Sequence, residues 1–253
     1  MSARFTAKTV LVTGAGSGAG RAIALAFARE GAAVVVAGRG AAPLEETVRL
    51  IEADGGRGAA VTADVTDAAS VAALVARTVE LFGGLDVAVN NAGAIVGVGP
   101  VADLDEADFR ATLDINVTGT WLSMKHEIGH MRANGGGAIV NIASNLGAHG
   151  RLANLGAYVT SKAAVSALTR NAALDHIGDG VRINAVSPGP LATTMSLRSG
   201  ETEAERSDRM KEQNPSGRVG DLAELAAAVL YLASDEAGFA VGTDLVLDGG
   251  ATA

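Results

Sequence analysis

The chain contains no cysteine among its 253 residues. This absence excludes a disulfide framework, thiolate metal sites and a cysteine nucleophile, and it is compatible with a reducing compartment. Aromatic residues are also scarce, at 3%, whereas apolar residues make up 48% and there are 33 glycines. The core must therefore be built from closely packed Ala, Val, Leu and Ile, which suits helices laid on a parallel sheet.

Long apolar runs and basic stripes are lacking as well. No apolar stretch reaches the roughly 18 residues of a membrane span, and the start MSARFTAKTVLV lacks the apolar core and cleavage site of a signal peptide. The net charge is −8, and the 20 Lys and Arg residues are scattered singly. We therefore expect a soluble, cytoplasmic, single-domain protein over 1–253 that binds neither nucleic acid nor a membrane.

Short β-branched runs alternate with longer alanine-rich amphipathic segments, which is typical of βαβ units. Asp221 and Glu224 have the spacing of a capping box at the start of the last helix. The expected strands lie near 8–13, 33–37, 59–63, 86–90, 138–143, 181–186 and 244–247, and the expected helices near 18–30, 43–54, 68–82, 105–133, 157–178 and 221–233. The pattern predicts an α/β fold, a single doubly wound domain whose seven-stranded parallel sheet carries helices on both faces.

One polar stretch, 196–216, interrupts this alternation just after a strand. It has no periodic apolar face. We interpret it as an insertion over a site, a mobile lid that is poorly ordered without ligand and closes over bound molecules.

The sequence TGAGSGAG follows the first expected strand and opens a helix with Gly14, Gly18 and Gly20. Glycines allow a tight turn and a close backbone approach to a pyrophosphate, whose charge is met by the helix N-terminus. The same residues also fit an ordinary strand-to-helix turn without any ligand. The turn alone therefore indicates a nucleotide only in combination with other motifs.

Further motifs follow the other strands. Tyr158 and Lys162 are four residues apart at the start of a helix, so both can reach one bound molecule. The other motifs are Asn90-Asn91-Ala92-Gly93, Ser144, Pro188-Gly189, Asp64-Val65, Asn116 and Leu247-Asp248-Gly249-Gly250. Together they resemble the short-chain dehydrogenase/reductase family over essentially the whole chain, which implies a Rossmann-type domain and an NAD(P)(H)-dependent oxidoreductase interconverting an alcohol and a carbonyl compound.

The resemblance assigns catalytic roles to four residues. Tyr158 is expected to be the acid/base, with its pKa brought closer to the working pH by the Lys162 ammonium and a cationic nicotinamide. Lys162 is also expected to hold the nicotinamide ribose. Ser144 orients the substrate oxygen, and Asn116 anchors a water in a relay to Lys162. Ser144 precedes Tyr158 by one residue more than is usual, and Asn145 occupies the usual place; we assign the role to Ser144 and the extra residue to RLANLGA.

The resemblance also implies a cofactor-binding set in which Asp64 accepts from the adenine amino group, Asn90 contacts the adenosine side and Thr193 lies near the nicotinamide carboxamide. Ala19 replaces a larger apolar residue that is common between the last two glycines. The expected set is Gly14, Ser17, Gly18, Ala19, Gly38, Arg39, Asp64, Val65, Asn90, Ala92, Gly93, Tyr158, Lys162, Pro188, Gly189, Leu191 and Thr193.

The end of the second strand favours NADP(H) over NAD(H), although NAD(H) use stays possible. NAD recognition normally places a carboxylate there for the ribose 2′-hydroxyl. Gly38 occupies this position and Arg39 follows it. A guanidinium can bind a 2′-phosphate through two donors, whereas its alternative is an ordinary solvated arginine.

A competing motif, His126-Glu127-Ile128-Gly129-His130, matches HExxH and would indicate a zinc metallohydrolase. No histidine or acid follows closely as a third ligand, and the next histidine, His149, lies beyond a strand. We interpret the motif as a chance match on the long fourth helix and expect no metal.

The substrate is expected to contact a mostly apolar set, which suggests a small or medium apolar carbonyl compound or alcohol. That set is Ala94, Ile95, Val96, Leu146, His149, Leu152, Leu191, Met195 and Leu197. The alternative within the family is a 3-oxoacyl-thioester (acyl carrier protein) reductase. The resemblance also implies a homotetramer whose interface is formed by helices 105–133 and 157–178.

Overall fold

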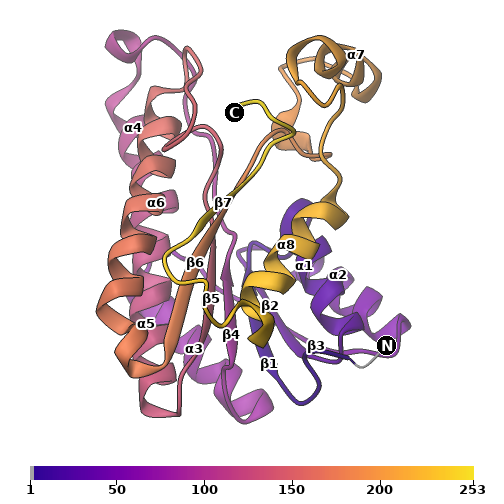
Figure 1. Ribbon diagram of the computed structural model, residues 1–253, viewed down its shortest axis with the longest axis vertical. Helices are drawn as coiled ribbons and strands as arrows, with labels where there is room; N and C mark the ends of the chain where they lie inside the picture. The colour runs from indigo at the N-terminus through magenta and orange to yellow at the C-terminus, as the bar shows by residue number, and fades with distance from the viewer. Residues whose placement is uncertain (1–2) are drawn as a thin grey trace.

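Across residues 3–253, which the computed structural model describes, seven parallel strands form one sheet in the order β3-β2-β1-β4-β5-β6-β7 (Figure 1). The strands are β1 Thr9–Thr13, β2 Ala33–Gly38, β3 Arg57–Thr62, β4 Val87–Asn90, β5 Gly137–Ile142, β6 Val181–Pro188 and β7 Asp244–Leu247. The predicted α/β class is confirmed. The winding reverses between β1 and β4, where ligands bind in such sheets.

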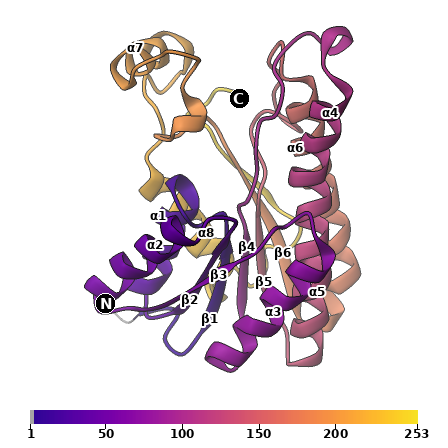
Figure 2. The same cartoon turned by 180° about the vertical axis from the view of Figure 1, so that it is seen from behind.

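Helices cover both faces of the sheet. Figures 1 and 2 show α1, α2 and α8 on one face and α3, α5 and α6 on the other. The bounds are α1 Gly18–Arg29, α2 Ala41–Ala53, α3 Ala68–Phe82, α4 Glu106–Leu113, α5 Gly119–Ala133, α6 Gly156–His176, α7 Glu203–Gln213 and α8 Leu222–Ala233. Helix α8 begins with the predicted capping box, in which the Asp221 N–H donates to the Glu224 carboxylate at 2.8 Å.

Side chains of alternating strand residues fill two cores. Val34 and Val36 of β2 pack with Ile23 and Phe27 of α1 on one face. Val35, between them, joins the second core on the opposite face, beneath α3, α5 and α6. Because both faces are buried, the strands are nearly continuous apolar runs, as the composition indicated.

The single helix expected at 105–133 is wrong. Helix α4 ends at Leu113, residues 114–118 form one turn of π-helix, and α5 continues from Gly119. Asn116, in the π turn, donates from Nδ2 to the Ala94 carbonyl at 2.9 Å and accepts from the Ala94 N–H at 2.8 Å. These non-local bonds hold the wider turn in register with the chain after β4.

The stretch 196–216 is also more regular than expected, because it contains α7. Thr202 and Glu205 form a capping box at its start, and Arg206 and Met210 turn inward and are buried. The Thr-x-x-Glu spacing was a sequence signal for this helix that the polar composition masked. Both views place α7 beyond the end of the sheet, on the opposite side from α4 (Figures 1 and 2).

Candidate active site

The glycine turn after β1 has the geometry that a pyrophosphate needs. Gly14 and Gly18 have φ of +67° and +50°. A Cβ on Gly20 would lie 2.3 Å from the Gly14 carbonyl oxygen, so only glycine fits there. Asn91 Nδ2 donates to the Thr13 and Gly14 carbonyls at 3.0 and 3.3 Å and so fixes the turn. The first turn of α1 carries no acidic residue, which leaves its positive end open to an anion.

A cleft of about 600 Å³ continues from this turn across the carboxyl ends of the strands. Its walls include several residues of the expected cofactor set, namely Gly14, Gly38, Arg39, Asp64, Val65, Ala92 and Gly93. They also include Ala111, Asp114, Ile115 and Thr118 of α4 and the π turn, which sequence reasoning missed. The missed residues belong to the segment that was expected to be ordinary helix.

Asp64 is prepared to act as an acceptor at this cleft. Its Oδ1 accepts from the Thr66 N–H at 2.9 Å and the Thr66 hydroxyl at 2.7 Å. These bonds, together with the charge of Arg39, hold the pKa of the Asp64 carboxyl below its ordinary value. The carboxylate is therefore ionised at neutral pH and suits the amino group of an adenine.

Tyr158 and Lys162 both lie on α6, on the side that faces the end of β5. Lys162 Nζ donates to the Ile142 carbonyl at 2.8 Å and lies 5.9 Å from the centre of the Tyr158 ring. Burial lowers the pKa of Lys162 to about 8. The Ser144 hydroxyl is hydrogen-bonded to Tyr158, so the structure brings together three of the four expected catalytic residues.

In the protein without cofactor, Lys162 alone does not lower the pKa of Tyr158. Burial raises the pKa of the phenol, and the hydrogen bond with Ser144 opposes that rise only in part. The Lys162 ammonium is turned to the Ile142 carbonyl, and its own charge is disfavoured by the same burial. The serine hydroxyl therefore stabilises the phenolate here where the ammonium was expected to.

Ser144 and Asn145 point to different places, which distinguishes the two alternatives for the substrate-orienting residue. Ser144 Oγ accepts from the Leu146 N–H at 3.1 Å and bonds Tyr158. Asn145 Nδ2 donates to Asp248 at 3.3 Å, in a buried position. Asn154, in the loop to which we assigned the extra residue, has a φ of +68°.

Asn116 is fully buried and lies close to Lys162. Besides its bonds to Ala94, its Nδ2 donates to Ser161 Oγ at 2.9 Å. A Cβ on Gly93 would lie 3.2 Å from Asn116 Oδ1 and 3.3 Å from Lys162 Nζ, so a glycine lets these groups approach. The water relay stays a prediction, since the Asn116 side chain is committed to other protein groups.

The segment after β6 returns to the glycine turn. The Gly189 N–H donates to the Leu247 carbonyl at 2.9 Å, and Leu191 is buried. A Cβ on Gly18 would lie 3.5 Å from the Thr193 methyl group, so Thr193 sits beside the start of α1. From α7, Arg206 Nη1 donates to the Thr193 carbonyl at 2.8 Å, and Arg209 Nη2 donates to the Ser196 carbonyl at 3.0 Å.

Two residues of the expected sets face elsewhere. Asn90 turns its amide into the protein, where Nδ2 donates to Glu127 Oε2 at 2.9 Å and Asn141 Oδ1 at 3.0 Å. Only the Asn90 backbone remains for a cofactor. His149 Nε2 bonds Asp244 at 3.0 Å, which ties this side chain to the start of β7. Ala19 packs against the core, as its type requires.

The other expected substrate residues lie on loops beyond the strand ends. Ala94, Ile95, Val96 and Leu146 are half-buried, whereas the Leu152 and Met195 residues are 56% and 52% exposed. Val98 and Val101 are exposed apolar residues near the same loops that sequence reasoning omitted. The set is therefore mostly apolar, with its outer members open to solvent.

The residues of the HExxH motif do not share one site. Glu127 is fully buried and accepts a hydrogen bond from Asn90 Nδ2, whereas His130 contacts Asn134 on the surface. Within residues 3–253, no group of three or more His, Cys, Asp or Glu side chains could hold a metal ion. The same part of the chain contains no helix long and apolar enough to cross a membrane.

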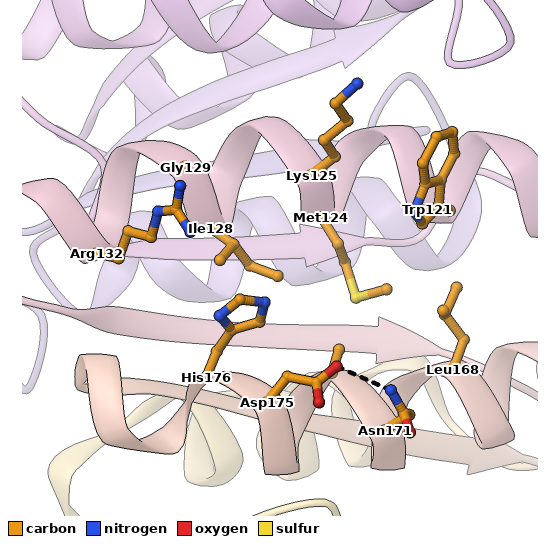
Figure 3. Close-up of a pocket in the computed structure, with 11 residues that line it drawn as sticks. Trp121, Met124, Lys125, Ile128, Gly129, Arg132, Leu168, Asn171, Asp175 and His176 are labelled. Carbon is orange, nitrogen blue, oxygen red and sulfur yellow. Dashed lines mark hydrogen bonds between the residues drawn. The ribbon is translucent and has the colours of Figure 1, made fainter.

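A second hollow, of about 400 Å³, lies between α5 and α6 (Figure 3). Met124 and Ile128 of α5 point toward Leu168 and His176 of α6, whereas Trp121 and Lys125 point away from α6. None of the four expected catalytic residues lines this groove. It is therefore separate from the nucleotide cleft.

Comparison with known proteins agrees with this geometry. A family model described as enoyl-(acyl carrier protein) reductase matches residues 14–252. The chain is 43% identical over 253 residues to cis-4-hydroxycyclohexanecarboxylate dehydrogenase of Sinomonas cyclohexanicum, covering 100% of each. It is 38% identical to cyclohexanol dehydrogenase of Acinetobacter sp. (strain SE19), covering 100% of this chain and 98% of that one. The crystal structure of NAD+-bound xylitol dehydrogenase aligns with a TM-score of 0.91 at 34% identity, covering 98% of this chain and 100% of that chain.

The chain belongs to the short-chain dehydrogenase/reductase family. It is an oxidoreductase of that family, acting on CH–OH or C=O groups with a nicotinamide cofactor.

Proposed function

We propose that the protein oxidises a secondary alcohol on a six-membered carbocyclic ring, and reduces the corresponding ketone. The observation that carries this proposal is the full-length identity of 43% to a dehydrogenase of a hydroxycyclohexane compound, together with a cyclohexanol dehydrogenase at 38%. The apolar residues expected around the substrate suit a saturated ring.

The residues of the site divide the chemistry in a simple way. Ser144 holds the substrate oxygen beside Tyr158, and Tyr158 takes the hydroxyl proton during oxidation and returns it during reduction. Lys162 and the glycine turn hold the ribose and pyrophosphate of the cofactor. When bound, the nicotinamide supplies or accepts the hydride. The loop that contains Ala94, Ile95 and Val96 excludes water from the reacting carbon.

The experiment is a turnover panel with purified protein. Cyclohexanol and cis-4-hydroxycyclohexanecarboxylate are compared with linear secondary alcohols, and acetoacetyl thioesters represent the 3-oxoacyl-thioester alternative. We expect cyclic alcohols to give the highest kcat/KM, and Tyr158→Phe serves as the inactive control. If thioesters are turned over faster than every cyclic compound, the proposed substrate class is wrong.

We further propose that NADP(H) is preferred over NAD(H). Arg39 is exposed on the wall of the cleft beside Gly38, where its charge acts on the nearby Asp64 carboxylate. A guanidinium in that place can bind a ribose 2′-phosphate. The NAD+-bound relative shows that the fold also accepts the unphosphorylated cofactor, so the preference needs direct measurement.

Two further parts of the function are proposed. The segment 196–216 acts as a lid, since α7 is tied through Arg206 to Thr193 beside the glycine turn. The protein assembles as a homotetramer through α5 and α6, where exposed apolar side chains are available. They are Trp121, at the groove of Figure 3, Leu174 of α6 and Ile177 just after α6. Size-exclusion chromatography with light scattering measures the assembly directly, and a monomer would contradict it.

A further inference from the structure

A buried polar cluster lies beneath the carboxyl ends of β4 and β5. It joins Asn90 of β4, Asn141 of β5, Glu127 of α5 and Thr169 of α6, and at most 4% of any of these residues is exposed. Asn90 Nδ2 donates to Glu127 Oε2 at 2.9 Å and to Asn141 Oδ1 at 3.0 Å. Asn141 Nδ2 in turn donates to Thr169 Oγ1 at 2.9 Å. The second Asn141 Nδ2 hydrogen is donated to Met124 Sδ at 3.2 Å, so every donor of the two amides is used.

Two oxygen atoms in this cluster have no hydrogen-bond partner among residues 3–253. They are Asn90 Oδ1 and Glu127 Oε1, the remaining oxygens of the amide and the carboxyl group that are already joined through Nδ2 and Oε2. An ionised carboxylate has only acceptors, so both oxygens would stay unpaired and a charge would be buried. A proton on Oε1 supplies a donor to Asn90 Oδ1 and leaves no charge.

We propose that Glu127 is protonated in the folded protein and forms a closed acid–amide pair with Asn90, which makes Glu127 a positioning residue for the ends of β4 and β5. The pair consists of Asn90 Nδ2–H donating to Oε2 and Oε1–H donating to Oδ1. This assignment accounts for a carboxyl group that the HExxH motif left without a function.

The electrostatics of the surroundings agree with a neutral acid. Burial raises the pKa of Glu127 to about 7, and only the Asn90 amide opposes this rise. Within the described chain, no charged group forms a hydrogen bond or ion pair with Glu127. Several charged and titratable groups lie on the elements packed around Glu127. They are Lys125, His126, His130 and Arg132 on α5, Arg77 and Glu80 on α3, Asp86 before β4, and Tyr158, Lys162, Arg170, Asp175 and His176 on α6. Arg77 pairs with Glu80 at 2.7 Å, and Asp86 pairs with Lys8 at 3.1 Å.

The cluster is linked to the active site by the residues that follow Asn90 on β4 and Asn141 on β5. Asn90 is followed by Asn91, which fixes the glycine turn through the Thr13 and Gly14 carbonyls. Asn141 is followed by Ile142, whose carbonyl accepts from Lys162 Nζ. Glu127 touches neither substrate nor cofactor, and acts by holding the two strand ends that carry these contacts.

The first test reads the proton directly by infrared difference spectroscopy of the full-length protein. At pH 6, exposed carboxyl groups are ionised, so the C=O stretching band of a protonated carboxyl group should be present in the wild type and absent in Glu127→Gln. The band should disappear as the pH passes about 7. A wild-type spectrum without this band at pH 6 would mean that an ionised Glu127 is accommodated in another way, and the proposal would be overturned.

The second test uses two substitutions that separate pairing from packing. Gln at position 127 can donate from Nε2 to Asn90 Oδ1 and accept from Nδ2, so Glu127→Gln should keep the strand ends in place at every pH. Glu127→Leu fills similar space but leaves the Asn90 amide unpaired, so we expect about tenfold weaker nucleotide binding, measured by calorimetry. Equal nucleotide affinity in the Leu and Gln variants would show that Glu127 positions nothing.

The pH profile of stability provides the third measurement. The pKa of Glu127 is about 7 in the folded protein against 4.5 as the model value, so only the unfolded chain releases this proton between those values. Folded-state stability from this group is therefore lost as pH rises from about 4.5 to about 7 and changes no further above that. The melting temperature of the wild type should fall relative to Glu127→Gln across this window. Parallel profiles would contradict the proposal. None of the three measurements requires the alcohol substrate to be known.

Discussion

Replacing Lys162 by methionine should stabilise the cofactor-free protein at neutral pH while abolishing most of its activity. Burial lowers the pKa of Lys162 from 10.5 to about 8. At about 1.36 kcal/mol per pKa unit, the charged ammonium costs the fold about 3 kcal/mol at pH 7. Methionine of similar length removes this cost, but it also removes the bond from Nζ to the Ile142 carbonyl, worth about 1–3 kcal/mol. The net gain at pH 7 is therefore small.

The stability difference between Lys162→Met and the wild type should change with pH by more than its value at pH 7. The penalty is fully present below the folded pKa of about 8 and disappears as pH rises through the unfolded value of 10.5. The free energy of unfolding of Lys162→Met relative to wild type should therefore fall by about 2–3 kcal/mol between pH 7 and pH 10.

Urea unfolding followed by circular dichroism, without cofactor, measures both proteins at each pH. Lys125→Met, at a solvent-facing position of α5, is the matched control and should show no such change. If the difference between Lys162→Met and wild type is the same at pH 7 and pH 10, the lysine carries no desolvation penalty.

Three other outcomes follow from the site. Tyr158→Phe should keep the fold and nucleotide affinity and lose about 10²- to 10⁴-fold in kcat, since only the proton-transferring oxygen is removed; retention of half the turnover would exclude this role. NADPH should exceed NADH in kcat/KM by about tenfold or more, with Arg39→Ala removing most of the gap and Gly38→Asp reversing it; equal use by the wild type would refute a 2′-phosphate contact. Arg206→Ala should speed proteolytic cleavage within 196–216 in the free protein, and bound NADP should slow cleavage in the wild type more than in the variant; identical protection with and without ligand would exclude the lid.

The strand and helix pattern was predictable because it depends on local composition. Runs such as β2, Ala33–Gly38, are apolar on both faces and short, so they read as buried parallel strands. The capping box at Asp221 placed the start of α8 to within a residue. The glycine turn was equally readable, because its conformation depends on the glycines themselves.

The parts that were missed depend on contacts between distant segments. The π turn around Asn116 is held by Ala94, and nothing in the helix sequence reveals that bond. Helix α7 is stabilised by burying Arg206 against Thr193, which a search for apolar periodicity does not detect. Likewise, the family resemblance assigned Asn90 to the cofactor, and the sequence does not reveal that its amide turns inward to Glu127.

The attachment of α7 through backbone carbonyls allows side chains beside it to be substituted. Arg206 and Arg209 bind the backbone carbonyls of Thr193 and Ser196, and every amino acid offers such a carbonyl. Met195 and Leu197, beside these anchors, can therefore be exchanged without detaching the helix. A library randomised at these two positions therefore tests whether they select the substrate, while α7 stays attached through its backbone anchors.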